Sequence, residues 1–343
     1  MKRVLVTGGA GFIGSHLIDN LLRETDWEIV SLDRLDFSGS LNRLHESIEN
    51  HPPEVRKRVK IVFHDLKAGI NPQVRSTIGK IDIIYHLAAG SHVDRSILYP
   101  LEFIEDNVLG TAHLLELART MDGLEHCIVF GTDEIFGPMI DTPYKENDRL
   151  NPSNPYSCSK AAAEMLAIAY ENTYGLPVIA THTMNCIGRR QAPEKYIPLC
   201  IRSIRDGLTI PIHADKTCTT AGSRFYIHAD DVASAMLFIV TSPAVKQHIQ
   251  NIKTQTIHCP KFNIVGERQL SNLVVAQTLA DIQGRPLKYE LVSFHESRKG
   301  HDLAYGLDDT LMRSLGWWPK QSINERLKEV SEWSLANPRW LNI

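Results

Sequence analysis

Two short motifs combine residues suited to oxidation and reduction with residues suited to acid–base chemistry. Thr132, Asp133 and Glu134 follow an apolar run. Tyr156 and Lys160 stand a short way downstream in a Tyr-x-x-x-Lys pattern. Such a pair suits reversible oxidation of an alcohol by a nicotinamide, whereas adjacent acids suit removal of a proton from carbon and departure of a hydroxyl. Elimination of water through a transient ketone would need both kinds of residue.

The Tyr-x-x-x-Lys pair is expected on one face of a helix, because Tyr156 and Lys160 are one helical turn apart. That helix should begin near Pro155 and stop at Gly175. A lysine ammonium close to a phenol stabilises the phenolate, so we expect it to lower the pKa of Tyr156 and to hold cofactor ribose hydroxyls. Taken alone, the pattern more often marks a half-buried tyrosine beside a surface lysine.

The adjacent acids can serve one substrate only if the chain leaves strand geometry, since neighbouring strand residues point to opposite faces. Gly131 and Gly137 would permit such a turn. Two carboxyl groups in a desolvated pocket do not both ionise easily, so one can stay protonated as an acid while its neighbour serves as a base. The alternative for Asp133 and Glu134 is an ordinary solvated turn.

The first glycine-rich segment has the features of a nucleotide site. Gly8, Gly11 and Gly14 form a Gly-x-x-Gly-x-x-Gly turn between an expected strand and an expected helix. Glycine lets the backbone turn sharply and approach a pyrophosphate, and the helix amino terminus offers N–H groups to phosphates. Asp33 follows about 20 residues later and would accept hydrogen bonds from ribose hydroxyls and repel a 2′-phosphate, which favours NAD. Arg34 keeps NADP open as an alternative.

Further cofactor contacts are expected at the ends of the following strands. Asp65 ends the third expected strand and could reach the adenine, although an isolated acid there is as often a helix cap. The cofactor-binding residues expected from the sequence are Gly8, Gly11, Phe12, Ile13, Gly14, Asp33, Asp65, Leu66, Leu87, Ala88, Ala89, Tyr156 and Lys160.

The elements that must position these residues alternate between strands and helices. Apolar runs typical of strands occur at 2–7, 28–32, 60–63, 81–87, 126–130 and 177–181. Such alternation predicts an α/β fold with a Rossmann-type doubly wound parallel sheet, covered by helices on both faces.

A smaller C-terminal substrate-binding lobe is expected beyond Gly188, where the pattern loosens into proline-bearing and polar segments. We expect residues 1–188, rejoined by 223–250, to form the NAD-binding Rossmann domain. Residues 189–222 and 251–343 should form the substrate-binding lobe.

Composition limits the partners of the chain. Its 343 residues, 43% hydrophobic, are enough to bury a full core. The net charge of -3 and the lack of a long basic block give no sign of nucleic-acid binding. The six cysteines have no metal-ligand spacing, and the amino terminus leaves no room for a signal-peptide core. We therefore expect a cytoplasmic protein with a small-molecule partner, no metal and no contact with a membrane.

Several segments together resemble a known family, the extended short-chain dehydrogenase/reductases, and within it the nucleotide-sugar 4,6-dehydratases of the dTDP-glucose 4,6-dehydratase type. The segments are TGGAGFIGSHL, HLAAGSHVDRS, FGTDEIFG, PYSCSK and APEKYIPL. The resemblance covers nearly the whole chain. It is most specific at Thr132-Asp133-Glu134, because related sugar epimerases usually carry small or neutral residues there.

The resemblance implies a role for each residue of the motif. Thr132 and Tyr156 would bind the 4-hydroxyl of the sugar, and Tyr156 would act as its base. Asp133 would donate a proton to the departing 6-hydroxyl, and Glu134 would remove the proton at carbon five.

Substrate contacts also follow from the resemblance. Asn185 matches a residue that holds the sugar phosphate, and Lys195 and Arg224 match residues near the nucleotide. Arginine suits a diphosphate because its planar fork donates paired hydrogen bonds, although a surface salt bridge is the alternative for Arg224. The substrate-binding residues expected are His92, Asn185, Lys195, Arg224, Asn263 and His301.

Some segments depart from the family pattern. Gly90 stands where a glutamate is typical, NCIGRR replaces NNYGP, and SRFYIHADD replaces an RDWLYVED-type segment. These segments line the nucleotide and sugar pocket in the family, so the base and the hexose can differ from thymidine and glucose.

The resulting expectation is an NAD-dependent hydro-lyase, a nucleoside-diphosphate-hexose 4,6-dehydratase that forms a 4-keto-6-deoxy sugar nucleotide from dTDP- or UDP-glucose. A nucleotide-sugar 4-epimerase or a uronate decarboxylase is the alternative on the same fold. A non-catalytic NAD-binding sensor is the alternative of a different class. The resemblance also implies a homodimer through two helices per subunit, one of them at 157–174.

Overall fold

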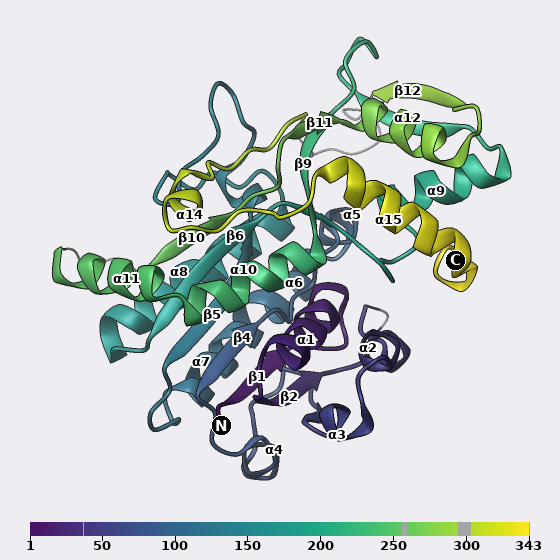
Figure 1. Ribbon diagram of the computed structural model, residues 1–343. Helices are drawn as coiled ribbons and strands as arrows, with labels where there is room; N and C mark the ends of the chain where they lie inside the picture. Colours follow the sequence, from purple (N-terminus) through teal and green to yellow (C-terminus); the bar gives the residue numbers. More distant parts are fainter. Residues whose placement is uncertain (37, 256–258, 294–302, 343) are drawn as a thin grey trace.

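A seven-stranded parallel sheet forms the centre of the molecule (Figure 1). The computed structural model describes residues 1–36, 38–255, 259–293 and 303–342. The order of the strands across the sheet is β10-β6-β5-β4-β1-β2-β3. Their bounds are β1 (Arg3–Thr7), β2 (Glu28–Asp33), β3 (Val59–Phe63), β4 (Ile83–His86), β5 (His126–Thr132), β6 (Val178–Thr183) and β10 (Lys261–Ile264). The predicted α/β fold with a doubly wound parallel sheet is confirmed.

Helices cover both faces of this sheet because its strands are apolar on both sides. On β1, Val4 and Val6 face a cluster that contains α1 and α10, whereas Leu5 faces a second cluster with α4 and α7. The helices that accompany the sheet are α1 (Phe12–Glu24), α2 (Leu41–Ile48), α3 (Pro53–Arg56), α4 (Pro72–Ile78), α5 (Val93–Leu98), α6 (Pro100–Phe103), η1 (Ile104–Leu109), α7 (Gly110–Ala118), η2 (Asp133–Phe136), α8 (Pro155–Tyr174), α10 (Ala229–Thr241), α11 (Pro243–Gln255) and α14 (Thr310–Ser314).

The carboxyl ends of the parallel strands meet at one edge of the sheet. Thr7, Asp33, His86, Thr132 and Thr183 are the last residues of β1, β2, β4, β5 and β6. Ligands of open α/β sheets bind outside this edge. The edge therefore gathers the glycine turn, the acidic motif and the segment that precedes the second lobe.

A second lobe packs over that edge (Figure 1). Its helices and strands surround a separate apolar cluster that includes Ile201, Leu279 and Leu327. The elements are β7 (Asn185–Ile187), α9 (Tyr196–Asp206), β8 (Ile210–Ala214), β9 (Ser223–His228), β11 (Gln269–Ser271), α12 (Asn272–Gln283), β12 (Tyr289–Ser293), α15 (Ile323–Ala336) and η3 (Pro338–Trp340).

Strand β10 differs from the expected division of the chain. The sequence analysis placed residues 251–343 in the smaller lobe, but β10 pairs in parallel with β6 and extends the central sheet. The run is four residues long and lies at the sheet edge, so its identity depends on a neighbour 80 residues earlier rather than on local pattern. Strands β7 and β9, which the expected division gave to the first domain, pair with β11 in a separate sheet of the second lobe, and α14 packs with the main sheet. The rest of the division stays a prediction.

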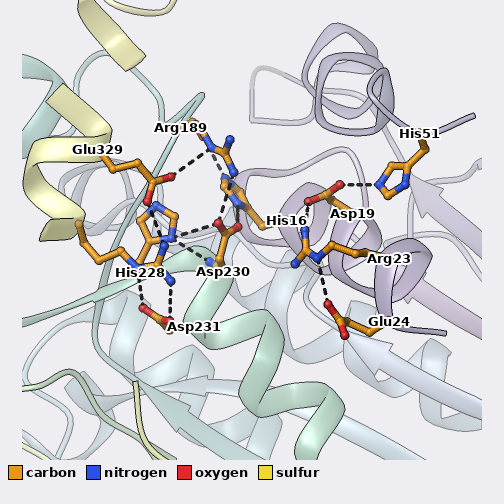
Figure 2. A network of polar contacts seen from close by, with 11 residues as sticks. His16, Asp19, Arg23, Glu24, His51, Arg189, His228, Asp230, Asp231 and Glu329 are labelled. Carbon is orange, nitrogen blue, oxygen red and sulfur yellow. Dashed lines mark hydrogen bonds and ion pairs between the residues drawn. The ribbon is translucent and has the colours of Figure 1, made fainter. Parts of the chain in front are cut away.

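A network of charged side chains joins the first helix to the second lobe (Figure 2). His16 on α1 lies 2.5 Å from Asp230 at the start of α10, and its other ring nitrogen lies 3.0 Å from the carbonyl of Arg189. On α15, Arg326 pairs with Asp231 at 2.7 Å. These contacts connect the helix behind the glycine turn with the last long helix of the chain.

Three side chains of this network lie close enough together to be considered as ligands of a metal ion. His228, Asp230 and Glu329 bring potential ligand atoms within 4.8 Å of one another. Arg189 lies 3.3 Å from Asp230, and Arg326 lies 3.0 Å from Glu329. Because guanidinium groups already neutralise both carboxylates, we interpret the cluster as an ion-pair network.

Candidate active site

A cavity of about 1170 Å³ lies at the carboxyl edge of the sheet and is lined by residues from both lobes. Among the residues that the structure describes, it brings together at this cavity all of those selected from the sequence except Asn263. The selected residues that line it are Gly8, Gly11, Phe12, Ile13, Gly14, Asp33, Asp65, Leu66, Leu87, Ala88, Ala89, His92, Thr132, Asp133, Glu134, Tyr156, Lys160, Asn185, Lys195 and Arg224.

The glycine turn is shaped to approach a phosphate. Gly8 has a φ of 70°, in the left-handed region that favours glycine. A Cβ at Gly14 would lie 2.1 Å from the carbonyl oxygen of Gly8, so a side chain there has no room. Gly11 is the N-cap of α1, and the first N–H groups of a helix have no partner within it. These donors line the cavity and fit the pyrophosphate of a dinucleotide.

Asp33 is held at the end of β2 by two backbone donors. Its carboxylate accepts from the N–H of Ala10 at 3.0 Å and from the N–H of Leu35 at 2.8 Å. Burial raises the pKa of Asp33, and these two hydrogen bonds oppose the rise. The side chain keeps contact with the cavity, where it can accept from ribose hydroxyls.

The guanidinium of Arg34 forms ion pairs with acidic side chains. It donates to both carboxylate oxygens of Asp106, at 2.5 and 2.8 Å, and it lies 2.6 Å from Asp36. An arginine neutralised in this way has little attraction left for a 2′-phosphate, so the residues fit NAD better than NADP. Asp65 accepts from the N–H of Lys67 at 2.9 Å within a turn, so it does not cap a helix, and it also lines the cavity.

The acidic motif leaves strand geometry at once. Strand β5 ends at Thr132, and Asp133 begins the short 3₁₀ helix η2. The Thr132 hydroxyl accepts from the N–H of Glu134 at 3.4 Å, and Gly137 closes the turn with a φ of 81°. The expected departure from strand geometry is confirmed, and both acids reach the same cavity.

Asp133 is buried, with 4% of its surface exposed. Burial, followed by the charge of Glu134, raises the pKa of Asp133 to about 7. Its Oδ1 accepts from the Thr132 hydroxyl at 3.1 Å, whereas its Oδ2 has no hydrogen-bond partner among the described residues. A carboxyl group that keeps a proton near neutral pH beside a second carboxyl group is arranged as an acid next to a base.

Tyr156 and Lys160 lie on α8 as the sequence predicts. The helix starts at Pro155 behind the N-cap Asn154, and Gly175 closes it in a left-handed conformation. Lys160 donates to the carbonyl of Phe130 at 2.6 Å. Burial lowers the pKa of the Lys160 ammonium to about 8, although a neighbouring carboxylate partly opposes this.

The expected lowering of the Tyr156 pKa is not observed. The phenol is 9% exposed, and burial, then the charge of Glu134, raises its pKa instead. Lys160 turns its ammonium toward the Phe130 carbonyl, so its charge does not offset the burial of the phenol. The four-residue spacing correctly predicted that Tyr156 and Lys160 lie on one face of the helix. It did not predict that the fold would bury the phenol in a medium of low dielectric constant.

A comparison with known proteins decides the family. The family model described as GDP-mannose 4,6 dehydratase matches residues 5–330. The chain belongs to the GDP-mannose 4,6 dehydratase family. A dTDP-glucose 4,6-dehydratase from Neisseria meningitidis serogroup B is 34% identical over 99% of this chain and 95% of its own length.

Solved structures agree with the sequence relatives. A dTDP-glucose 4,6-dehydratase from Streptomyces venezuelae, crystallised with NAD bound, matches with a TM-score of 0.84 at 32% identity and covers 98% of both chains. A UDP-glucuronic acid 4-epimerase from Bacillus cereus reaches the same TM-score at 22% identity over 98% of this chain, which shows the shared fold alone. The predicted extended short-chain dehydrogenase/reductase of the 4,6-dehydratase type, a hydro-lyase with NAD as cofactor, is confirmed.

Three of the residues predicted to contact substrate lie in the second lobe. Asn185 starts β7, Lys195 is the N-cap of α9, and Arg224 lies on β9. The Arg224 guanidinium lies 4.7 Å from the ring centre of Tyr305 and donates to the carbonyl of Leu303 at 2.8 Å. These contacts orient a planar cation at the cavity wall, as a phosphate site requires.

Asn263 does not line the cavity, contrary to the expectation. It is fully buried on β10, where its amide donates to the carbonyls of Tyr144 and Asp308 at 3.0 and 3.2 Å. The expectation failed because it took Asn263 for part of the smaller lobe, whereas its strand pairs with the main sheet. His301 lies outside the described residues.

Other residues of the cavity were not selected from the sequence. Arg43 lines the cavity near Asp33, and its side chain donates to the carbonyls of Ser38 and Arg190. A lone arginine inside an amphipathic helix carries no signal for this role. The further cavity residues with polar side chains include Gln191, Tyr196, His213, Tyr226, Asn272 and Tyr305.

Proposed function

We propose that this dehydratase converts a nucleoside-diphosphate glucose, dTDP- or UDP-glucose, to its 4-keto-6-deoxy form. The observation that carries the proposal is the pair of acids at one cavity, with Asp133 able to keep its proton near neutral pH. A 4-epimerase or a decarboxylase has no shared task for these two acids. A sensor has no use for the complete set of acid, base and Tyr-Lys pair.

The residues at the end of β5 and on α8 supply the proton transfers. The glycine turn and Asp33 would hold NAD, which when bound would supply the acceptor of hydride from carbon four of the sugar and the donor of hydride to carbon six. Thr132 holds the 4-hydroxyl, and Tyr156 takes its proton. Because the ketone makes the proton on carbon five acidic, Glu134 can remove it, and Glu134 returns this proton to carbon five when hydride reaches carbon six. Asp133 gives its proton to the 6-hydroxyl, which leaves as water.

Burial of the phenol has a consequence for this scheme. A Tyr156 with a raised pKa is a poor base by itself, so its deprotonation has to be driven by positive charge in the filled site. Bound oxidised NAD would supply positive charge through its nicotinamide ring, and the Lys160 ammonium would add its own after turning from the Phe130 carbonyl. We expect the tyrosine to act as a base only when cofactor and substrate are both bound.

A panel of nucleoside-diphosphate hexoses, incubated with the purified protein and analysed by mass spectrometry, tests the function and the substrate together. Loss of water from dTDP- or UDP-glucose is the expected result. Products of unchanged mass with inverted sugar configuration would favour an epimerase, and loss of carbon dioxide from a uronate would favour a decarboxylase. Binding of NAD without any turnover would favour a sensor.

We also propose a homodimer. Helices α5 and α6 and the segment η1 pack beside α8. Along them, large apolar side chains are exposed, among them Leu98 at 70%, Leu101 at 76% and Met165 at 45%. Large apolar side chains exposed along neighbouring helices are typical of a protein interface.

We further propose that the protein works in the cytoplasm, a reducing compartment. All six cysteines are free thiols, and burial raises the pKa of Cys127 and Cys259. None of the described helices has the length and apolar character needed to cross a bilayer. Fractionation of the source cells, followed by detection of the protein with an antibody, tests this location.

A further inference from the structure

Helix α8 carries a second buried charge one turn beyond Lys160. Glu164 is 3% exposed, and each of its oxygens faces a cationic or ring nitrogen. One oxygen lies 2.9 Å from Nε2 of His182 on β6, and the other lies 2.8 Å from the ammonium of Lys261 on β10. Tyr156, Lys160 and Glu164 are spaced four residues apart, so they share one face of the helix.

Each ring nitrogen of His182 faces a hydrogen-bond acceptor. Nδ1 lies 2.9 Å from Oδ1 of Asn263. The amide nitrogen of Asn263 donates to the carbonyls of Tyr144 and Asp308, so the orientation of the amide is set and its oxygen faces the ring. His182 therefore meets an acceptor at each nitrogen, an amide oxygen and the Glu164 carboxylate. Two acceptors facing one fully buried ring fit a histidine that donates from both nitrogens.

This ring lies directly behind the acidic motif. It packs edge-on against Phe136 of η2, with ring centres 5.0 Å apart. A Cβ at Gly131 would lie 3.2 Å from Cδ2 of His182. His182 thus contacts the segment that carries Thr132 to Glu134, and through Glu164 it holds the helix that carries Tyr156 and Lys160.

The charges around Glu164 come from every element packed against it. Lys160 lies on its own helix, His182 on β6 and Lys261 on β10, and the carboxylate of Glu146 accepts from the N–H of Asn263 at 3.2 Å. Burial by itself raises the pKa of Glu164, but His182 and Lys261 outweigh it and hold the pKa at about 2. The ionised carboxylate in turn opposes the lowering of the Lys160 pKa by burial.

We propose that His182 and Glu164 form a buried ion pair of positioning residues that fixes α8 against the acidic motif and keeps Lys160 an ammonium at the working pH. Asn263, which does not touch the cavity, sets the charge of this pair by presenting its amide oxygen. The role rests on the proposed function, because it matters through the Tyr156 and Lys160 chemistry.

Nitrogen NMR of ¹⁵N-histidine-labelled protein tests the charge without any turnover, so it stands even if the proposed reaction is wrong. The signal of His182 is assigned by its loss in His182→Gln. At the pH of the activity assay, the ion pair requires both ring nitrogens to carry a proton. One unprotonated ring nitrogen at that pH would overturn the ion pair.

The role in catalysis is tested by the pH dependence of nicotinamide reduction in the substrate complex. Glu164→Gln removes the anion next to Lys160, so the fall in rate at alkaline pH should begin about one pH unit lower than in the wild type. Glu164→Asp, which keeps the charge, should restore most of the wild-type profile. An unshifted profile in a folded Glu164→Gln variant contradicts the role.

Glu171→Gln is the matched control. Glu171 lies two turns further along α8 and pairs with Lys253 of α11 at 3.4 Å. The same chemical change should leave the pH profile where it is. Equal shifts in the Glu164 and Glu171 variants would show a general effect on the helix and would also overturn the proposal.

Discussion

Burial makes Asp133 different from an ordinary surface aspartate. Its raised pKa means that the folded protein binds more protons than the unfolded chain between pH 4 and about 7. Stability should therefore fall as the pH rises through this window. The destabilisation is complete above about pH 7 and absent below pH 4.

Asp133→Asn removes this pH dependence. From pH 4 to pH 8 the variant should gain up to about 4 kcal/mol of unfolding free energy relative to the wild type, since each pKa unit corresponds to about 1.4 kcal/mol. Urea unfolding at several pH values measures the difference. Asp141→Asn, a change at an exposed acid, is the control and should run parallel to the wild type. A difference that does not vary with pH would contradict a buried, protonated Asp133.

Tyr156→Phe removes the hydroxyl that takes the alcohol proton. Reduction of the nicotinamide on mixing with substrate should slow by at least about 100-fold, because general base catalysis contributes that much or more. Stopped-flow absorbance follows the reduced nicotinamide. Substrate binding, measured separately by calorimetry, should change little. A wild-type rate of reduction would assign the proton transfer to another residue.

At the scale of elements, the glycine turn between β1 and α1 has no space for a side chain at Gly14. Gly14→Ala puts a methyl group 2.1 Å from the Gly8 carbonyl oxygen, so the turn must move. We expect the purified variant to retain much less NAD after gel filtration. Gly69→Ala is the control, because a Cβ there meets nothing within 4 Å. Equal NAD content in the two variants would argue against this turn as the cofactor site.

The local elements of the site could be predicted because short-range chemistry determines them. The turn at Gly8 to Gly14, the capped helix from Pro155 and the break at Thr132 all depend on glycine, proline and helical spacing within a few residues. What could not be predicted depends on distant partners. Strand β10 needs β6 beside it, and the role of Asn263 depends on that pairing.

Electrostatics were predicted in part for the same reason. The sequence suggested that one of two adjacent acids would keep its proton, and Asp133 does so because the fold buries it. The sequence did not predict the raised pKa of Tyr156, because its main cause is burial of the phenol in the folded protein. Burial is a property of the assembled fold rather than of any one motif.

At the scale of the whole molecule, the exposed apolar side chains along α5, α6 and η1 should form the interface of a dimer. Leu98→Glu combined with Leu101→Glu places two charges in it and should give a monomer in sedimentation velocity. Leu208→Glu, at a residue 55% exposed on the second lobe, should leave the dimer intact. A wild-type protein that sediments as a monomer, or a double variant that stays dimeric, would contradict this interface.

The central claim is that one cavity first oxidises the sugar and then removes water with Glu134 as the base. Glu134→Gln separates the two steps. After rapid mixing with dTDP- or UDP-glucose, we expect reduced nicotinamide to accumulate while water loss, followed by mass spectrometry, falls at least about 100-fold. The surface variant Glu125→Gln should behave as the wild type. Water loss at the wild-type rate in Glu134→Gln would contradict the account.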